Sequence, residues 1–400
     1  MKPTNISNKA NLLARRNFLS QTGCALLTAT LSLRAEDDDD DADEIDPNDG
    51  SEKETAAYRP DYKKTGVKLI TDSTPLADGF YMPGEELKHE ATVMVFPQEQ
   101  NWEDEGIERV RKEWIAVAHA IVEHEKVRMV VHPQDMKIAK RLLDSEIELI
   151  EMHVNDGWAR DTAPLFLIND KGERRATGFI FNGWGAKFPP FSADSLLKAR
   201  LCAKWKIPFY PMDVVSEGGA VLVDGDGTLI VTEECLLHKN RNPNLDKATI
   251  EKLLMEGLGA KKVIWLGKGL TPDPVTDGHV DGMAAFAEPG VVLLHSIDDK
   301  ADPNFKILAD AKRRLKESTD AKGRKFEVID LPLADEVGQM NFYICNGAVI
   351  VPVSGDKSQD DEPLGILKDV FKKRKIIPVR GNILAKGGGG VHCITQQVPG

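Results

Sequence analysis

The chain has 400 residues, 41% of them hydrophobic, so it can bury a large core in one or two domains. Its net charge of −12 is uneven: residues 1–35 carry five basic and no acidic side chains, whereas residues 36–54 carry twelve acidic side chains and one lysine. No basic patch stands out in the remainder, which argues against a nucleic-acid partner.

Residues 1–35 resemble a twin-arginine export signal, because Arg15 and Arg16 precede a short apolar stretch from Cys24 to Leu33. A disordered basic terminus is the alternative. The apolar stretch is too short to span a bilayer as a mature helix, so we expect no stable membrane anchor. We expect an exported, periplasmic protein.

Residues 36–65 are predicted to form a disordered acidic linker, because the consecutive carboxylates of Asp37–Asp41 repel one another. Residues 66–400 are then expected to form a single catalytic domain.

From about residue 90 the chain repeats an apolar strand, an amphipathic helix and a second apolar strand five times. Such a repeat predicts either a closed ring of blades or a doubly wound sheet. Extra strands are predicted at Ala220–Asp224 and Met283–Ala287. The five predicted units are Ala91–Pro97, Ile107–Glu123 and Val127–His132; Ala176–Asn182, Ser195–Lys204 and Ile207–Met212; Thr228–Thr232, Lys247–Leu258 and Lys262–Leu266; Val291–His295, Asn304–Glu317 and Phe326–Leu331; and Ala348–Val353, Pro363–Lys373 and Lys375–Val379.

Four polar clusters lie where one unit ends and the next begins, at residues 155–161, 216–219, 277–281 and 390–393. In a ring of blades, equivalent positions between strands converge on the axis, so these clusters would share one pocket. An open sheet does not explain why they recur at matching points. The placement therefore favours a five-bladed α/β propeller.

The last cluster ends on Cys393, which follows His392 and a run of glycines. A thiol beside a histidine can be tuned toward thiolate and act as a nucleophile. A buried, unreactive cysteine is the alternative. The five cysteines show no CxxC pair, and we expect no disulfide.

His279 and Asp281 are two residues apart, so on a strand both would face the same way. This arrangement suits a general acid or base beside an anionic anchor. A metal site is the alternative, but no third ligand lies at helix or hairpin spacing, and we expect no metal.

Asp161 and Trp158 offer an acid and an aromatic face, and Glu217 offers a carboxylate that could orient the histidine. A surface salt bridge with Arg160, a core tryptophan and a turn cap are the respective alternatives. Carboxylates and an aromatic face together suit a planar guanidinium, whose carbon would stay open to a thiolate.

At these residues the chain resembles the agmatine deiminase / Porphyromonas-type peptidylarginine deiminase family of guanidino-group-modifying enzymes. The resemblance implies a pentein-type α/β propeller of five ββαβ blades and no metal or organic cofactor. It extends over nearly all of residues 80–400, with matching motifs at Met82–Glu85, His89–Thr92, Asn155–Asp161, Phe181–Gly185, Glu217–Gly219, Asn240–Pro243, Asp277–Asp281 and Gly387–Pro399.

The resemblance also implies roles for the site residues. Cys393 attacks the guanidinium carbon, and His279 protonates the leaving ammonia and later activates water. Asp161 and Asp281 match the acids that hold the guanidinium. Trp158 matches the pocket aromatic and Glu217 the partner of the histidine.

The implied reaction is hydrolytic deimination of a guanidino substrate, with agmatine giving N-carbamoylputrescine and ammonia on the route to putrescine. Deimination of peptidyl-arginine to citrulline is the main alternative. An amidinotransferase and a non-catalytic guanidine-binding protein are more distant, and the motifs of papain-like and caspase-like cysteine proteases are missing. The expected partner is a small guanidine or a peptidyl-arginine substrate, and the sequence is compatible with a homo-oligomer.

Overall fold

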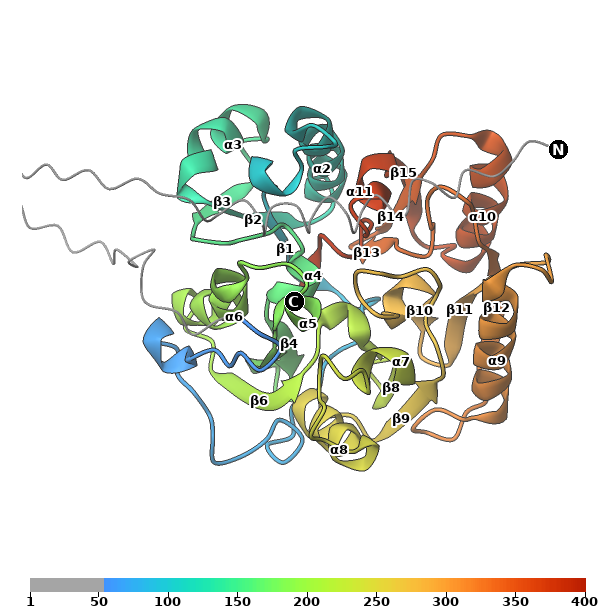
Figure 1. Cartoon of the computed structure of the whole chain (residues 1–400), viewed down its shortest axis with the longest axis horizontal. Coiled ribbons are helices and arrows are strands. Elements are labelled where there is room, and N and C mark those ends of the chain that lie inside the picture. The colour runs from blue at the N-terminus through green and yellow to red at the C-terminus, as the bar shows by residue number, and fades with distance from the viewer. Residues whose placement is uncertain (1–53) are drawn as a thin grey trace, which may run out of the picture. The chain divides into compact units, whose positions relative to one another are not determined.

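Five small sheets build the part of the chain that the computed structural model describes, residues 54–400 (Figure 1). Each sheet contains an antiparallel pair of strands followed by a parallel pair, and a helix connects the two parallel strands. This ββαβ unit occurs five times. The prediction of a five-bladed α/β propeller is therefore confirmed.

The strands of the five sheets are β16 (Gln396–Pro399), β1 (His89–Val95), β2 (Lys126–Val131) and β3 (Glu148–Glu151); β4 (Leu165–Ile168), β5 (Arg174–Ile180) and β6 (Phe209–Val215); β7 (Leu222–Val223), β8 (Thr228–Thr232) and β9 (Lys262–Leu266); β10 (Ala284–Glu288), β11 (Val291–Ser296) and β12 (Glu327–Pro332); and β13 (Tyr343–Cys345), β14 (Ala348–Val353) and β15 (Lys375–Arg380).

The helices that connect parallel strands are α2 (Ile107–Val122), α6 (Ser192–Lys204), α8 (Lys247–Leu258), α9 (Pro303–Glu317) and α10 (Lys357–Val370). The remaining helices are short α-helices and 3₁₀ helices (η): η1 (Tyr62–Thr65), η2 (Glu99–Asn101), η3 (Pro133–Asp135), α3 (Met136–Leu142), α4 (Ala159–Thr162), α5 (Gly183–Ala186), η4 (Gly218–Ala220), α7 (Glu233–Leu236), η5 (Val280–Gly282) and α11 (Asn382–Lys386).

The predicted strand–helix–strand order is found in all five units, and the bounds of the third unit agree residue for residue. Helix α10 begins at Lys357, ahead of the predicted start at Pro363, because the side chain of Asp356 accepts a hydrogen bond from the Ser358 amide and caps the helix earlier. Strands β3, β4, β13 and β16 were not predicted.

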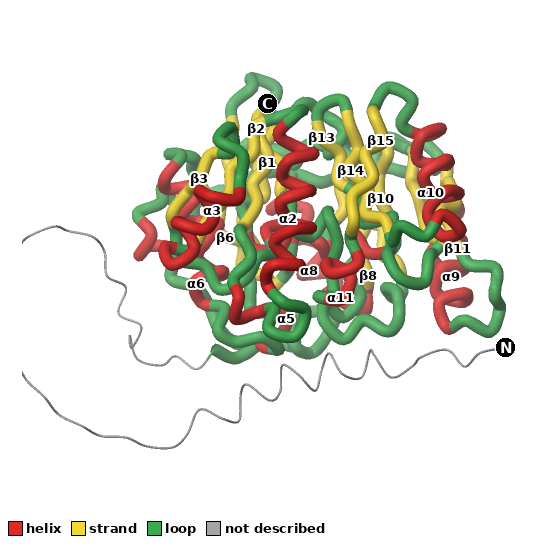
Figure 2. Tube along the Cα trace, turned by 90° about the horizontal axis from the view of Figure 1, so that it is seen from above, coloured by secondary structure: helices red, strands yellow, loops and turns green. Residues whose placement is uncertain are grey.

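Helix α2 shows how the helices join neighbouring blades. Its buried side chains, among them Val110, Trp114, Val117 and Ile121, recur every three or four residues and form one apolar face. This face packs in a cluster with residues of β2 and of the fifth sheet, including Ile350. Figure 2 shows α2 in front of the strands of these sheets. Burial of this face therefore holds the first and fifth blades together.

The chain closes its ring through β16, which pairs antiparallel with β1, so that Thr92 lies opposite Gln397 and Val93 opposite Gln396. The first blade thus takes its first strand from the C-terminal end of the chain and its other strands from the N-terminal part of the domain. Because Cys393 lies just ahead of β16, the same pairing positions the predicted nucleophile.

Residues 54–65, which were predicted as linker, belong to the same compact unit as residues 66–400. The Glu54 carboxylate accepts hydrogen bonds from the amides of Phe191 and Ser192 at the start of α6. The ring of Tyr62 is buried, and its centroid lies 5.1 Å from that of the Phe209 ring. The aromatic residues that follow the acidic run could have indicated that the domain begins before residue 66.

The predicted export signal and the greater part of the predicted linker lie in residues 1–53, outside the described residues. Among residues 54–400, no helix has both the length and the apolar character that crossing a membrane requires.

Because β16 closes the ring, shortening a buried side chain of this strand should destabilise the domain. Val398 is fully buried against the first and second sheets, so Val398→Ala is expected to lower the free energy of unfolding by about 2 kcal/mol through loss of packing and a residual cavity. Urea denaturation of the purified protein measures this. Leu87→Ala is the control, because Leu87 is 45% exposed; equal effects of the two changes would contradict the role given to β16.

Candidate active site

The structure brings all four predicted polar clusters together. The amide of Gly219 donates to Asp161 Oδ1 at 2.9 Å. His279 Nε2 lies 3.4 Å from Glu217 Oε2. The thiol of Cys393 lies 3.7 Å from Asp281 Oδ2. Convergence of loops from separate blades, as the repeat predicted, is therefore observed.

The thiol of Cys393 has two oxygen neighbours, Asp281 Oδ2 and, at 3.4 Å, Asn341 Oδ1. The Cys393 amide also donates to Asn341 Oδ1, and its carbonyl accepts from the amide of Arg160. Burial, together with the negative charges of Asp281 and Asp161, raises the pKa of the Cys393 thiol well above its ordinary value. At neutral pH the group is therefore a protonated thiol.

His392 does not act on its neighbour Cys393 in the way the sequence suggested. Its Nδ1 lies 2.9 Å from Asp281 Oδ2, and its Nε2 lies 2.9 Å from Glu85 Oε1. A ring that donates from both nitrogens must be an imidazolium. The two carboxylates outweigh burial and the positive charge of Arg160, so the pKa of His392 is raised.

His392 is one member of a buried chain of alternating charges that ends at Asp281. Arg160 Nη1 lies 3.1 Å from Glu85 Oε1, which also meets His392. Burial alone would raise the pKa of Asp281, but the hydrogen bond and positive charge of His392 outweigh it and lower that pKa. Asp281 is thereby kept as a carboxylate beside the sulfur.

His279 does not lie on a strand, so the predicted reason for its proximity to Asp281 is wrong. It precedes the 3₁₀ turn η5, which contains Asp281, and its Nδ1 lies 3.9 Å from Asp281 Oδ1. On the other side of the ring, Glu217 contacts His279 through Oε2 and accepts from Arg241 Nε through Oε1 at 2.7 Å. Arg241 thus orients the carboxylate that orients the histidine.

The electrostatics of this part of the site favour an imidazolium. Burial lowers the pKa of His279, but the negative charge of Asp161 and hydrogen bonds with Cys235 and Glu217 outweigh it and raise that pKa well above its ordinary value. For Glu217, burial is outweighed by Arg241 and His279, and the carboxyl pKa is lowered. At neutral pH His279 therefore holds a proton that it can donate.

Asp161 is fixed by two donors, the Gly219 amide and Trp184 Nε1, each at 2.9 Å. Burial raises its pKa. A Cβ on Gly219 would lie 2.6 Å from His279 Nδ1 and 2.9 Å from Asp281 Oδ2. Only glycine therefore lets the backbone approach all three groups.

Trp158 is a core tryptophan that also lies close to Cys393. It is 5% exposed and packs against Trp102 and Trp114, with ring centroids 5.8 Å away in each case. The same cluster contacts Cys393. A Cβ on Gly389 would lie 2.3 Å from the Trp158 ring, so the glycine run before the thiol lets backbone pass directly over this indole.

Sequence reasoning missed Asn341, Arg241, Glu85 and Cys235 as members of the site. Asn341 lies between β12 and β13, the fifth interval between blades, at the point where the other intervals carry their polar clusters. This equivalent position in the repeat was the feature of the sequence that could have identified Asn341 as a site residue. Arg241 and Glu85 lie in motifs that carry the family resemblance, but no contact to a site residue could be inferred for them.

The arrangement offers two buried carboxylates, a thiol that contacts one of them, and a protonated histidine braced by a third carboxylate. A flat cation can be held by the carboxylates while the sulfur and the imidazolium reach its carbon and its nitrogen.

Comparisons with known proteins agree with this chemistry. A family model described as Porphyromonas-type peptidyl-arginine deiminase matches residues 81–399. The chain is 39% identical to agmatine deiminase of Pseudomonas aeruginosa, over 82% of this chain and 97% of that protein. It is 37% identical to agmatine deiminase of Medicago truncatula, over 82% and 98% respectively. The solved structure of agmatine deiminase of Enterococcus faecalis matches with a TM-score of 0.80 at 37% identity, covering 83% of this chain and 99% of that one. The chain belongs to the Porphyromonas-type peptidyl-arginine deiminase family.

Proposed function

We propose that the protein is a hydrolase that converts agmatine and water to N-carbamoylputrescine and ammonia. The observation that carries the proposal is the thiol of Cys393 held 3.7 Å from the buried carboxylate of Asp281, with protonated His279 on the other side of that carboxylate. Its relatives named agmatine deiminase match nearly their whole length, which supports agmatine as the substrate.

Substrate binding activates the nucleophile. Asp161 and Asp281 each accept from the guanidinium, whose positive charge offsets the carboxylate charges that raise the pKa of Cys393. The thiol therefore releases its proton to solvent when the substrate binds, and the thiolate forms beside the guanidinium carbon.

In the first half-reaction an S–C bond forms between Cys393 and the guanidinium carbon. His279 transfers its proton to one nitrogen of the tetrahedral species, the C–N bond breaks and ammonia leaves. The enzyme then carries a thiouronium-type group on Cys393, and His279 is neutral.

In the second half-reaction neutral His279 accepts a proton from a water molecule that attacks the same carbon. The S–C bond breaks, the sulfur leaves as thiolate and takes up the proton of the new hydroxyl group, and the neutral ureido product is released with Cys393 again a thiol. Glu217 stabilises the imidazolium at each stage at which it forms, and it takes no proton itself.

The closed site favours a small amine over a protein side chain. Asp161 and Asp281 are 6% and 5% exposed. Lys187 Nζ ties the segment after α5 to the loop before His279 through the carbonyls of Pro274 and Val275. A free agmatine molecule fits such a site more easily than an arginine attached to a folded backbone.

Turnover of a substrate panel tests the proposal. Purified protein should release ammonia and N-carbamoylputrescine from agmatine, and its kcat/KM for free arginine and for arginine peptides should be at least about 100-fold lower. Cys393→Ser is the control: it should lose turnover and still bind agmatine in calorimetry. Citrulline formation from peptides at a rate equal to that of agmatine would favour the peptidyl-arginine alternative instead.

The charge chain predicts a positioning role for His392. Because this imidazolium keeps Asp281 ionised, His392→Gln should lower kcat/KM about 10- to 100-fold, the equivalent of a lost hydrogen bond to a charged group. It should also raise the pKa of Asp281, so the acid limb of the kcat/KM profile moves to higher pH. His119→Gln, on the outer helix α2, is the control. An unmoved acid limb would argue that His392 only fills space.

We also propose that the protein acts after export through the twin-arginine pathway, on the strength of Arg15, Arg16 and the apolar stretch that follows them. Replacing both arginines by lysine should keep the protein and its deiminase activity in the cytoplasmic fraction, whereas the unaltered chain should appear in the periplasmic fraction. Equal distribution of the two forms would contradict this proposal.

A further inference from the structure

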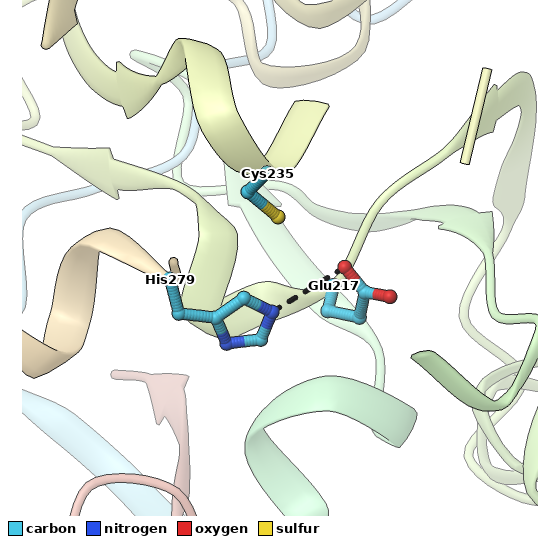
Figure 3. Close-up of side chains that lie close together, drawn as sticks. All are labelled: Glu217, Cys235 and His279. Carbon is cyan, nitrogen blue, oxygen red and sulfur yellow. Dashed lines mark hydrogen bonds and ion pairs between the residues drawn. The ribbon is translucent and has the colours of Figure 1, made fainter. Parts of the chain in front are cut away.

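Cys235 lies beside the catalytic centre but takes part in none of the steps above. It comes from α7, and one possible donor atom each from Cys235, Glu217 and His279 lie within 4.8 Å of one another (Figure 3). Cys235 and Glu217 are fully buried, and His279 is 5% exposed. Cys235 is therefore a possible third metal ligand, contributed by α7, that the spacing of residues in the sequence did not indicate.

We propose that Cys235, His279 and Glu217 form a binding site for a thiophilic divalent cation, with Zn²⁺ as the reference ion, and that its occupation stops deimination. The second half of this proposal rests on the proposed function, whereas the first half does not. Thiolate, imidazole and carboxylate are the donors that zinc takes in proteins. An ion held by His279 Nε2 displaces the Nε2 proton and leaves a neutral imidazole, whose remaining Nδ1–H on the Asp281 side is a far weaker acid than the imidazolium that the reaction needs.

The geometry needs little rearrangement. Zinc bonds of about 2.0 to 2.3 Å in a tetrahedral arrangement place neighbouring donors about 3.3 to 3.6 Å apart. His279 Nε2 and Glu217 Oε2 are already 3.4 Å apart. The thiol donates to the Thr276 carbonyl at 3.6 Å. It completes the set by shifting about 1 Å, which a χ1 rotation of about 30° within its rotamer supplies. The fourth position is left for water.

Arg241 does not prevent binding, although it is buried beside Glu217. Its Nε occupies Glu217 Oε1, so Oε2 remains for the ion. When Zn²⁺ enters, the imidazolium proton of His279 and the thiol proton of Cys235 leave. Two positive charges replace two protons, so the net charge that faces Arg241 does not change.

Metal binding is tested first without catalysis. The Cys393→Ser protein removes the competing thiol, and Co²⁺ is added as a spectroscopic substitute for zinc. One equivalent should produce an absorption band of a cobalt–thiolate bond, and excess Zn²⁺ should abolish it. Adding Cys235→Ala should remove the band and weaken Zn²⁺ binding in calorimetry at least tenfold. A band that persists without Cys235 would overturn the proposal.

Inhibition is tested on protein that retains Cys393. Zn²⁺ should inhibit turnover of agmatine and EDTA should restore it. In Cys235→Ala, or in Cys235→Ser if the alanine protein does not fold, the half-inhibiting Zn²⁺ concentration should rise at least tenfold relative to that variant's own activity. Cys202→Ala is the matched control, because Cys202 is a fully buried free cysteine on α6, and it should leave the value unchanged.

An unchanged half-inhibiting concentration in the Cys235 variants would show that zinc acts through other groups, and would overturn the inhibitory half of the proposal. If agmatine is not a substrate at all, the cobalt band still reports on the metal site. The two failures are therefore distinguishable.

Discussion

The pairing of β16 with β1 is the constraint on which the rest of the structure depends. It closes five blades into a ring, because the first blade lacks the edge strand next to β1 until the C-terminal end of the chain supplies it. The pairing also anchors the segment that carries Cys393, so ring closure and assembly of the site are one event. Loop closure between such distant segments costs conformational entropy, which the buried faces of helices such as α2 offset.

Two chains of alternating charge run through the site. Arg160, Glu85, His392 and Asp281 form one chain, and Arg241, Glu217 and His279 form another. Burial penalises an unpaired charge strongly, and such pairing is the usual means by which a protein tolerates ions in its interior. The two chains meet at Asp281 and His279, which leaves carboxylate charge available to a cationic substrate.

This electrostatic arrangement explains how a thiol with a raised pKa can serve as a nucleophile. In the proposed reaction, the carboxylates that would bind the guanidinium also keep the sulfur protonated, so reactivity would appear only with the substrate in place. His279 is held as an imidazolium by its acidic neighbours and begins the cycle as an acid. The neighbourhood that makes it a good proton donor, including Cys235, is also the one that would suit a thiophilic metal ion.

The sequence by itself determined the repeat and the order of the strands and helices within its five units, and it singled out Cys393, His279, Asp161, Asp281 and Glu217 as candidates for the chemistry. These follow from local properties: periodicity, β-branched runs and polar clusters at matching points. Tertiary structure alone decided which partner each of these residues meets. His392 meets Asp281 and Glu85 rather than its neighbour Cys393, Asn341 reaches the sulfur from another blade, and Cys235 reaches His279 from α7. Contacts between residues far apart in the chain depend on how the blades pack and where the ring closes, and no local pattern encodes that geometry.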